Sequence, residues 1–199
     1  MTVKAGFQQE AAQRILKRTA GGLLLLEGLL IYAPLAILGA AIGRPASLDL
    51  PASANLPLMV AERPLVLLGY TVYLLYSVLF WPVSHLAARV LSRGPAGQAR
   101  GLARLASGFG VGSAVLRVLG IVRWLVPMQL LADVWVAPTT TEATRTTLSL
   151  LYETLNAYAG SVGELLGVSL FAALWAGLVS VSVLRTGSLP RAFGWLGIV

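Results

Sequence analysis

Four apolar runs, each long enough to cross a bilayer, constrain the fold of this chain more than any other feature. They lie at about residues 19–42, 64–88, 105–127 and 161–184. An α-helix rises 1.5 Å per residue, so about 20 apolar residues span the roughly 30 Å hydrocarbon core of a membrane. The chain is 57% hydrophobic and 12% charged, whereas a soluble domain carries about 25% charged residues. We therefore predict an all-α, polytopic transmembrane helix bundle that forms a single integral membrane domain over residues 1–199.

The segments between these runs predict three further elements. Residues 44–63 are rich in Pro, Ala and Ser and are typical of a loop. Thr139 and Glu142 have the spacing of a capping box, which predicts an outer amphipathic helix at about 140–159, interrupted by Gly160 and Gly163 before the fourth run. Residues 192–199, which follow a short turn, predict either the start of a fifth span or a short segment in the membrane interface.

The basic residues fall mainly on one side of this layout. The outer segments hold Arg44, Arg63 and Arg145. With the N-terminus inside, the inner segments hold ten of the fifteen Lys and Arg residues: Lys4, Arg14, Lys17, Arg18, Arg89, Arg93, Arg100, Arg104, Arg185 and Arg191. Because cytoplasmic loops retain Lys and Arg, we predict a multi-pass membrane protein with a cytoplasmic N-terminus. The same sorting accounts for the formal charge of +7 without a nucleic-acid partner.

Four charged residues remain inside the apolar runs, namely Glu27, Arg117, Arg123 and Glu164. An ionisable side chain at membrane depth costs about 2.5–3.5 kcal/mol even on insertion scales, so each needs a partner within the protein. If the first and third helices both start at the inner surface, Glu27 and Arg117 lie at similar depths, while Arg123 and Glu164 lie near the outer surface. We therefore predict two buried charge pairs, Glu27 with Arg117 and Glu164 with Arg123.

The face of the third run around Arg117 is made of small residues. Gly110, Ser113, Arg117 and Gly120 fall on one stripe at helical spacing, and Trp124 continues this stripe outward. Small residues let the backbones of neighbouring membrane helices approach closely. The stripe therefore predicts a packing face, and the embedded charges are interpreted first as pairs that specify which helices pack together. A polar cavity or ion path, or contacts with a partner chain, are the alternatives.

Few residues in this chain suit catalytic chemistry. Cysteine is absent and histidine occurs once, at His85, so the sequence predicts neither a metal site nor a bound cofactor. His85 is a weak candidate for proton transfer or ligand binding, and an interfacial side chain is the simpler interpretation. Tyr73 is a second weak candidate, because an aromatic stripe in a membrane helix is usually bundle core or interface belt. No phosphate-binding loop, dinucleotide fingerprint or nucleophile elbow occurs.

Three short motifs resemble a known family. They are RVLGIVRW at 117–124, GELLG at 163–167 and LPRAFGWLG at 189–197. In this order they resemble a family of bacterial multi-pass membrane proteins, domain of unknown function family 4386. The resemblance implies a helical membrane bundle, located in the bacterial cytoplasmic (inner) membrane, and no established activity. Family members often carry a histidine where this chain has Leu165 and Leu166, which argues against metal or proton chemistry at that point.

These observations predict an integral membrane protein without enzymatic activity. Its expected role is that of a structural or accessory subunit of a membrane complex, in contact with the lipid bilayer and with a protein partner or further copies of itself. The alternative is a small-solute or ion transporter or channel, with Arg117 and Glu27 at a polar site. A membrane-embedded enzyme using His85 and Glu27 is the third interpretation. The sequence does not identify a small-molecule ligand.

Overall fold

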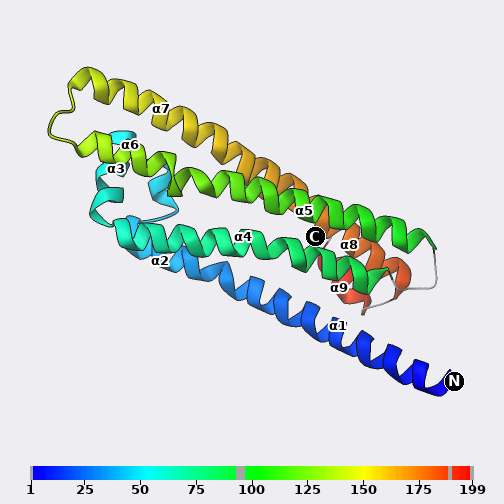
Figure 1. Cartoon of the computed structure of the whole chain (residues 1–199). Helices are drawn as coiled ribbons and strands as arrows, with labels where there is room; N and C mark the ends of the chain where they lie inside the picture. The colour runs from blue at the N-terminus through cyan, green and yellow to red at the C-terminus, as the bar shows by residue number, and fades with distance from the viewer. Residues whose placement is uncertain (1, 93–96, 188–189, 198–199) are drawn as a thin grey trace. The chain divides into compact units, whose positions relative to one another are not determined.

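The computed structural model describes residues 2–92, 97–187 and 190–197, and these residues form helices and no strand (Figure 1). In chain order the helices are α1 (Thr2–Leu30), α2 (Tyr32–Ile42), the 3₁₀ helix η1 (Ala46–Asp49), α3 (Ala52–Ala61), α4 (Arg63–Leu91), α5 (Gly97–Leu125), α6 (Pro127–Val136), α7 (Glu142–Gly160), the π-helix η2 (Ser161–Ala172), α8 (Ala173–Thr186) and α9 (Arg191–Leu196). They divide into two compact units. Unit 1 comprises Met1–Gly28, Leu79–Ala114 and Leu170–Val199, and unit 2 comprises Leu29–Val78 and Val115–Ser169.

Four helical stretches of the described chain are long and apolar enough to cross a membrane. They are Ala11–Ile42, Arg63–Leu91, Arg100–Val136 and Glu142–Thr186. Each stretch contains one of the four apolar runs, so the predicted fold class is confirmed. Of the ten basic residues assigned to the inner side, Arg93 lies outside the described residues.

Residues 44–63 are helical for the most part, and the predicted loop is wrong. They form η1 and α3, which are separated by a short link. Asn55, Leu56 and Met59 on α3 are each fully buried, because helical spacing places them on one face that packs against α6 and α7 (Figure 1). Burial of this face overrides a composition that is typical of loops.

The helix that begins at Glu142 continues without a break through α7, η2 and α8 to Thr186. The interruption predicted at Gly160 and Gly163 takes the form of a change in hydrogen-bond pattern: α7 ends at Gly160 and the π-helix η2 continues through Gly163. The N-cap is also shifted from the predicted Thr139 to Thr141, whose hydroxyl accepts a hydrogen bond from the Thr144 N–H at 3.2 Å. Such a cap satisfies one of the N–H groups that a helix leaves unpaired at its start.

Unit 2 has the larger apolar core of the two. Its fully buried members include the aromatic residues Tyr70, Trp124 and Tyr152. The remaining buried members are Leu38, Ile42, Ala52, Leu56, Met59, Val66, Ile121, Met128, Leu131, Ala132 and Leu148. A polar link crosses this core, because the Asn55 side-chain amide donates to the Tyr152 hydroxyl at 2.6 Å and to the Ser47 carbonyl at 3.0 Å. The link fixes η1, α3 and α7 to one another.

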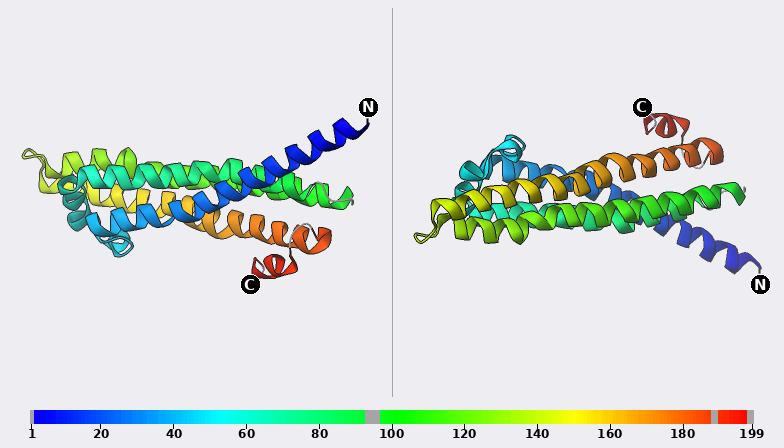
Figure 2. Two further views of the ribbon diagram at one scale, coloured as in Figure 1. Left: turned by 90° about the horizontal axis from the view of Figure 1, so that it is seen from below. Right: turned by 90° about the horizontal axis from the view of Figure 1, so that it is seen from above.

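Unit 1 is held by aromatic pairs and by the packing of α9 on α8. The Phe80 and Trp175 ring centroids lie 4.9 Å apart, and those of Phe109 and Phe171 lie 5.5 Å apart. Figure 2 shows α9 folded back beside the end of α8, where a Cβ added to Gly194 would lie 2.6 Å from Leu184 Cγ. The predicted start of a fifth span thus contains the short helix α9, and its last residues, 198–199, lie outside the described residues.

The closest backbone approach in unit 2 joins α5 to η2. A Cβ added to Gly120 would lie 2.6 Å from Gly163 Cα and 3.1 Å from the Ala159 carbonyl oxygen. Real Cβ atoms do not approach backbone atoms so closely, so the two helices would have to separate. Small residues at this crossing are therefore a requirement of the packing.

We expect Gly120→Ala to lower the free energy of unfolding by about 1–3 kcal/mol, the usual cost of overpacking. The measurement is thermal or denaturant unfolding in detergent. Gly108→Ala on the same helix is the matched control, because a Cβ there meets nothing within 4 Å. This variant should be more stable than the wild-type protein by up to roughly 1 kcal/mol, since alanine has a higher helix propensity than glycine. Equal stability of the two variants would contradict the close crossing.

Candidate functional site

The site in unit 2 begins with the turn that ends α2. Gly43 has a φ of 66°, in the left-handed region that glycine adopts at little cost. Its N–H donates to the Gly39 carbonyl at 3.0 Å, and the Arg44 N–H donates to the Leu38 carbonyl at 3.3 Å. This C-terminal cap turns the chain sharply, so that Arg44 follows the helix directly with its side chain only 7% exposed.

An aromatic cage surrounds the Arg44 guanidinium group. Tyr70 on α4 and Trp124 on α5 are stacked, with their ring centroids 5.2 Å apart and an interplanar angle of 4°. Arg44 Cζ lies 5.0 Å from the Tyr70 centroid, 5.7 Å from that of Trp124 and 5.9 Å from that of Tyr73. These distances fall within the range of cation–π attraction, so the rings stabilise the positive charge while excluding water from it.

Arg123 reaches the same place from α5. It is 5% exposed, and its Nη1 donates to the Gly120 carbonyl at 3.0 Å, while its Cζ lies 5.2 Å from the Trp124 centroid. A Cβ added to Gly160 would come within 3.3 Å of Arg123 Nη2. Gly160 therefore gives the guanidinium group room beside α7.

Glu164 is shared by the two arginines. Its Oε1 lies 3.7 Å from Arg123 Nη2 and 3.9 Å from Arg44 Nη2. The structure thus brings Arg123 and Glu164 together, but the prediction that Glu164 is buried is wrong, because its side chain is 59% exposed. The reason is geometric: Gly163 faces Gly120, so the next residue lies at the rim of the crossing.

These groups line a pocket of about 350 Å³, a volume that includes its open mouth. Arg44, Arg117 and Arg123 contribute three guanidinium groups, and Glu164 is the single acidic group among the described residues that line it. The remaining wall consists of Tyr73, Ser77, Gly120, Ile121, Trp124, Gly163 and Val168. Arg44 Nη1 and Arg123 Nε are buried without a hydrogen-bond acceptor among the described residues. The pocket therefore has more donors than its own acceptors satisfy.

The other predicted site residues are distributed over both units. Glu27 is 8% exposed and belongs to unit 1, whereas Arg117 is 6% exposed and belongs to unit 2. Their pairing stays a prediction. Arg117 lies with its Cζ 5.3 Å from the Tyr76 ring centroid. Along α5, the four residues of the predicted packing face are all buried: Gly110, Ser113, Gly120 and Trp124.

The two weak candidates have different positions. Tyr73 is partly buried and lines the pocket of unit 2. His85 is exposed in unit 1, where its Nδ1 lies 3.4 Å from the Ser107 hydroxyl. Only Tyr73 is therefore part of the arginine pocket.

Arg44 lines the pocket although the sequence places it in an outer loop. Its charge falls just beyond an apolar run and is followed by Pro45, which is typical of a loop. The signal that marks it is Gly43, since a glycine at the end of a helical run predicts a left-handed cap that returns the next residue toward the helix.

The fold and the pocket define this protein as a helical membrane protein with a buried, arginine-rich site. A family model described as domain of unknown function (DUF4386) matches residues 19–199, and the chain belongs to this family. The resemblance that the three motifs indicated is thereby confirmed. No curated protein and no solved structure matches the chain.

The Tyr70 hydroxyl gives a test of the cage, because it is buried without a hydrogen-bond partner among the described residues. We expect Tyr70→Phe to leave the free energy of unfolding unchanged or raised by up to about 1 kcal/mol, since an unsatisfied hydroxyl is removed. Tyr70→Leu should lower it by roughly 1–3 kcal/mol, because both ring stacking and the cation–π contact are lost. Unfolding in detergent measures both, and a Phe variant as unstable as the Leu variant would contradict the cage.

Proposed function

We propose that this protein binds a small anion in the pocket of unit 2 and carries it across the membrane. One observation carries the proposal: Arg44 and Arg123 are buried, share one exposed carboxylate at more than hydrogen-bond distance, and each keep a buried N–H group without an acceptor among the described residues. Buried charged donors are costly unless they are paired and hydrogen-bonded. A bound anion supplies the missing acceptors.

The chemistry of the pocket indicates the class of ligand. Guanidinium groups donate in a planar fork that matches a carboxylate or a phosphate. Because the volume of about 350 Å³ includes the open mouth, the enclosed part of the pocket is much smaller and suits only a small anionic group. The walls include Tyr73, Ile121 and Val168, which suit an apolar body. The proposed ligand is therefore a small carboxylate or phosphate with little other polar surface.

Glu164 is the internal competitor of such an anion. Its carboxylate is the anionic group that both arginines share, yet its distances of 3.7 and 3.9 Å exceed those of a hydrogen bond. An incoming anion that approaches more closely gains the hydrogen bonds that Glu164 does not make. Release is assisted when Glu164 returns, so the same residue limits affinity and permits turnover.

The test is isothermal titration of the purified protein in neutral detergent with benzoate and with inorganic phosphate. Arg44→Gln and Arg123→Gln should each weaken binding by about 10–100-fold, because a hydrogen bond to a charged group contributes about 1.5–3 kcal/mol. Glu164→Gln should change affinity in the opposite direction and strengthen binding, because the competing charge is removed. Arg145→Gln is the matched control, since Arg145 is exposed and does not line the pocket.

The opposite result would support a purely structural role for the arginines. If neither probe binds the wild-type protein and the arginine variants only lose stability, the arginines fix helix packing, as expected of an accessory subunit. Transport is examined separately, by phosphate or benzoate flux into proteoliposomes. Binding without flux would remove the carrier part of the proposal and leave an anion receptor.

We also propose an orientation in the bacterial cytoplasmic membrane, with the N-terminus inside. The distribution of basic residues supports it, because nine of the ten inner Lys and Arg residues belong to described helices or to the ends of described helices: Lys4, Arg14, Lys17, Arg18, Arg89, Arg100, Arg104, Arg185 and Arg191. Positive charge is retained on the cytoplasmic side. In this orientation Arg44, Arg123 and Glu164 lie at the outer ends of their apolar runs.

A further inference from the structure

Unit 1 contains a second basic cleft, which shares no residue with the arginine pocket. It occupies about 840 Å³ including its mouth. Arg89, Arg100 and Arg104 line it together with His85, Ser92 and Ser107. Among the described residues that line the cleft, none is acidic.

Small residues form the floor of this cleft. Ala88 on α4 is 7% exposed and Ala103 on α5 is 1% exposed, and both belong to a core cluster with Leu91 and Val183. The two helices therefore approach closely at the floor, and the longer basic side chains stand around the mouth. His85 Nδ1 and the Ser107 hydroxyl, 3.4 Å apart, close its deeper end.

The position of the cleft along the helices indicates what reaches it. Arg89 directly follows the apolar run 64–88, and Arg104 directly precedes the run 105–127. Polar residues that flank a membrane-crossing run lie at the level of the lipid headgroups. The cleft is thus located where phosphate groups of lipids are most concentrated.

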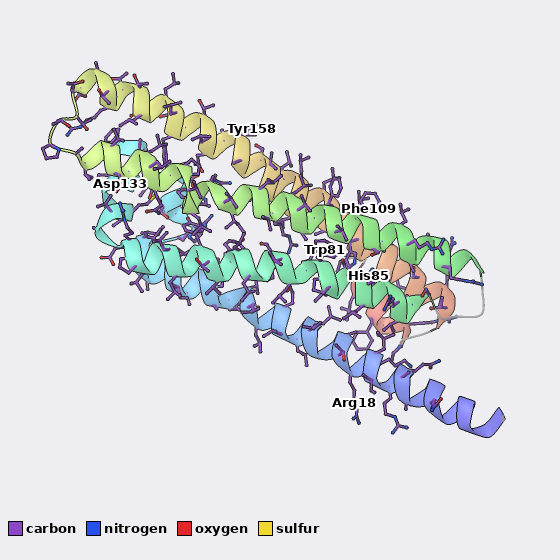
Figure 3. The ribbon with its side chains drawn as sticks, viewed as in Figure 1. Arg18, Trp81, His85, Phe109, Asp133 and Tyr158 are labelled. Atoms are coloured by element: carbon purple, nitrogen blue, oxygen red, sulfur yellow. The ribbon has the colours of Figure 1, made fainter. Side chains whose placement is uncertain are left out.

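Exposed apolar side chains lie next to the cleft on the same helices. Trp81 is 54% exposed and lies one turn before His85 on α4 (Figure 3), and Leu105, between Arg104 and Ser107 on α5, is 52% exposed. An acyl chain attached to a phosphate in the cleft would lie beside them. A free phosphate ion would make no use of this surface.

We propose that this cleft is a specific binding site for the headgroup of an anionic phospholipid. The guanidinium groups of Arg89, Arg100 and Arg104 bind the phosphate diester, and the hydroxyls of Ser92 and Ser107 are placed to donate further hydrogen bonds. Basic pockets between membrane helices bind lipid headgroups through this combination of charge and depth. This site is independent of the anion pocket of unit 2.

The experiment is isothermal titration of the full chain in neutral detergent with short-chain phosphatidylglycerol, short-chain phosphatidylcholine and inorganic phosphate. The wild-type protein should bind phosphatidylglycerol at least about tenfold more tightly than either other probe. The triple variant Arg89→Gln, Arg100→Gln, Arg104→Gln should lose roughly a hundredfold in affinity, from the known contribution of basic residues at a membrane surface. Each single variant should lose roughly fivefold.

The matched control removes three positive charges elsewhere in unit 1. Arg14→Gln, Lys17→Gln, Arg18→Gln changes three exposed residues of α1 (Arg18 in Figure 3) and should alter the affinity less than threefold. Equal losses in the two triple variants would overturn the site in favour of unspecific charge attraction. Phosphate binding as tight as that of phosphatidylglycerol would show that a free anion is the ligand. If the cleft triple variant does not fold, the affinities of the three single variants for phosphatidylglycerol are the test, and unchanged affinity in all three would overturn the site.

Discussion

The burial of guanidinium groups is the physical constraint on which unit 2 depends. Arginine stays charged in proteins, so a buried side chain must be met by aromatic faces, carbonyl groups or anions. Unit 2 supplies aromatic faces and a carbonyl group. The stacked rings of Tyr70 and Trp124 cover Arg44, and the Gly120 carbonyl accepts a hydrogen bond from Arg123. The glycines of α5, α7 and η2 provide the space in which these contacts form. The backbone of unit 2 thus leaves the space that two buried guanidinium groups need.

The elements marked by a long apolar run or by a stripe of residues at helical spacing could be predicted from the sequence. The four apolar runs appear as helices, and the stripe on α5 consists of buried residues, because both patterns reflect the fixed geometry of an α-helix. The segment 44–63 could not be assigned in this way, because Pro and Ser indicate a loop while the burial of Asn55 and Met59 depends on contacts with α6 and α7. Distant packing of this kind leaves no local signature.

Only part of the candidate site could be predicted from the sequence. Arg117, Arg123 and Glu164 could be found because charges in apolar runs are conspicuous. For Arg44 the sequence holds only the indirect signal of Gly43, because the rings that cover its guanidinium group come from two other helices. The exposure of Glu164 was likewise missed, since depth along a helix says nothing about which side of that helix a residue occupies.

The π-helix η2 gives the position of Glu164 a further meaning. Hydrogen bonds in a π-helix join residues five apart, whereas those of an α-helix join residues four apart. The same twelve residues can therefore shorten or lengthen their turns while every carbonyl keeps a donor. Such a change would rotate Glu164 about the helix axis without unfolding the segment. The carboxylate that Arg44 and Arg123 share is therefore carried by a helix whose turns can change register.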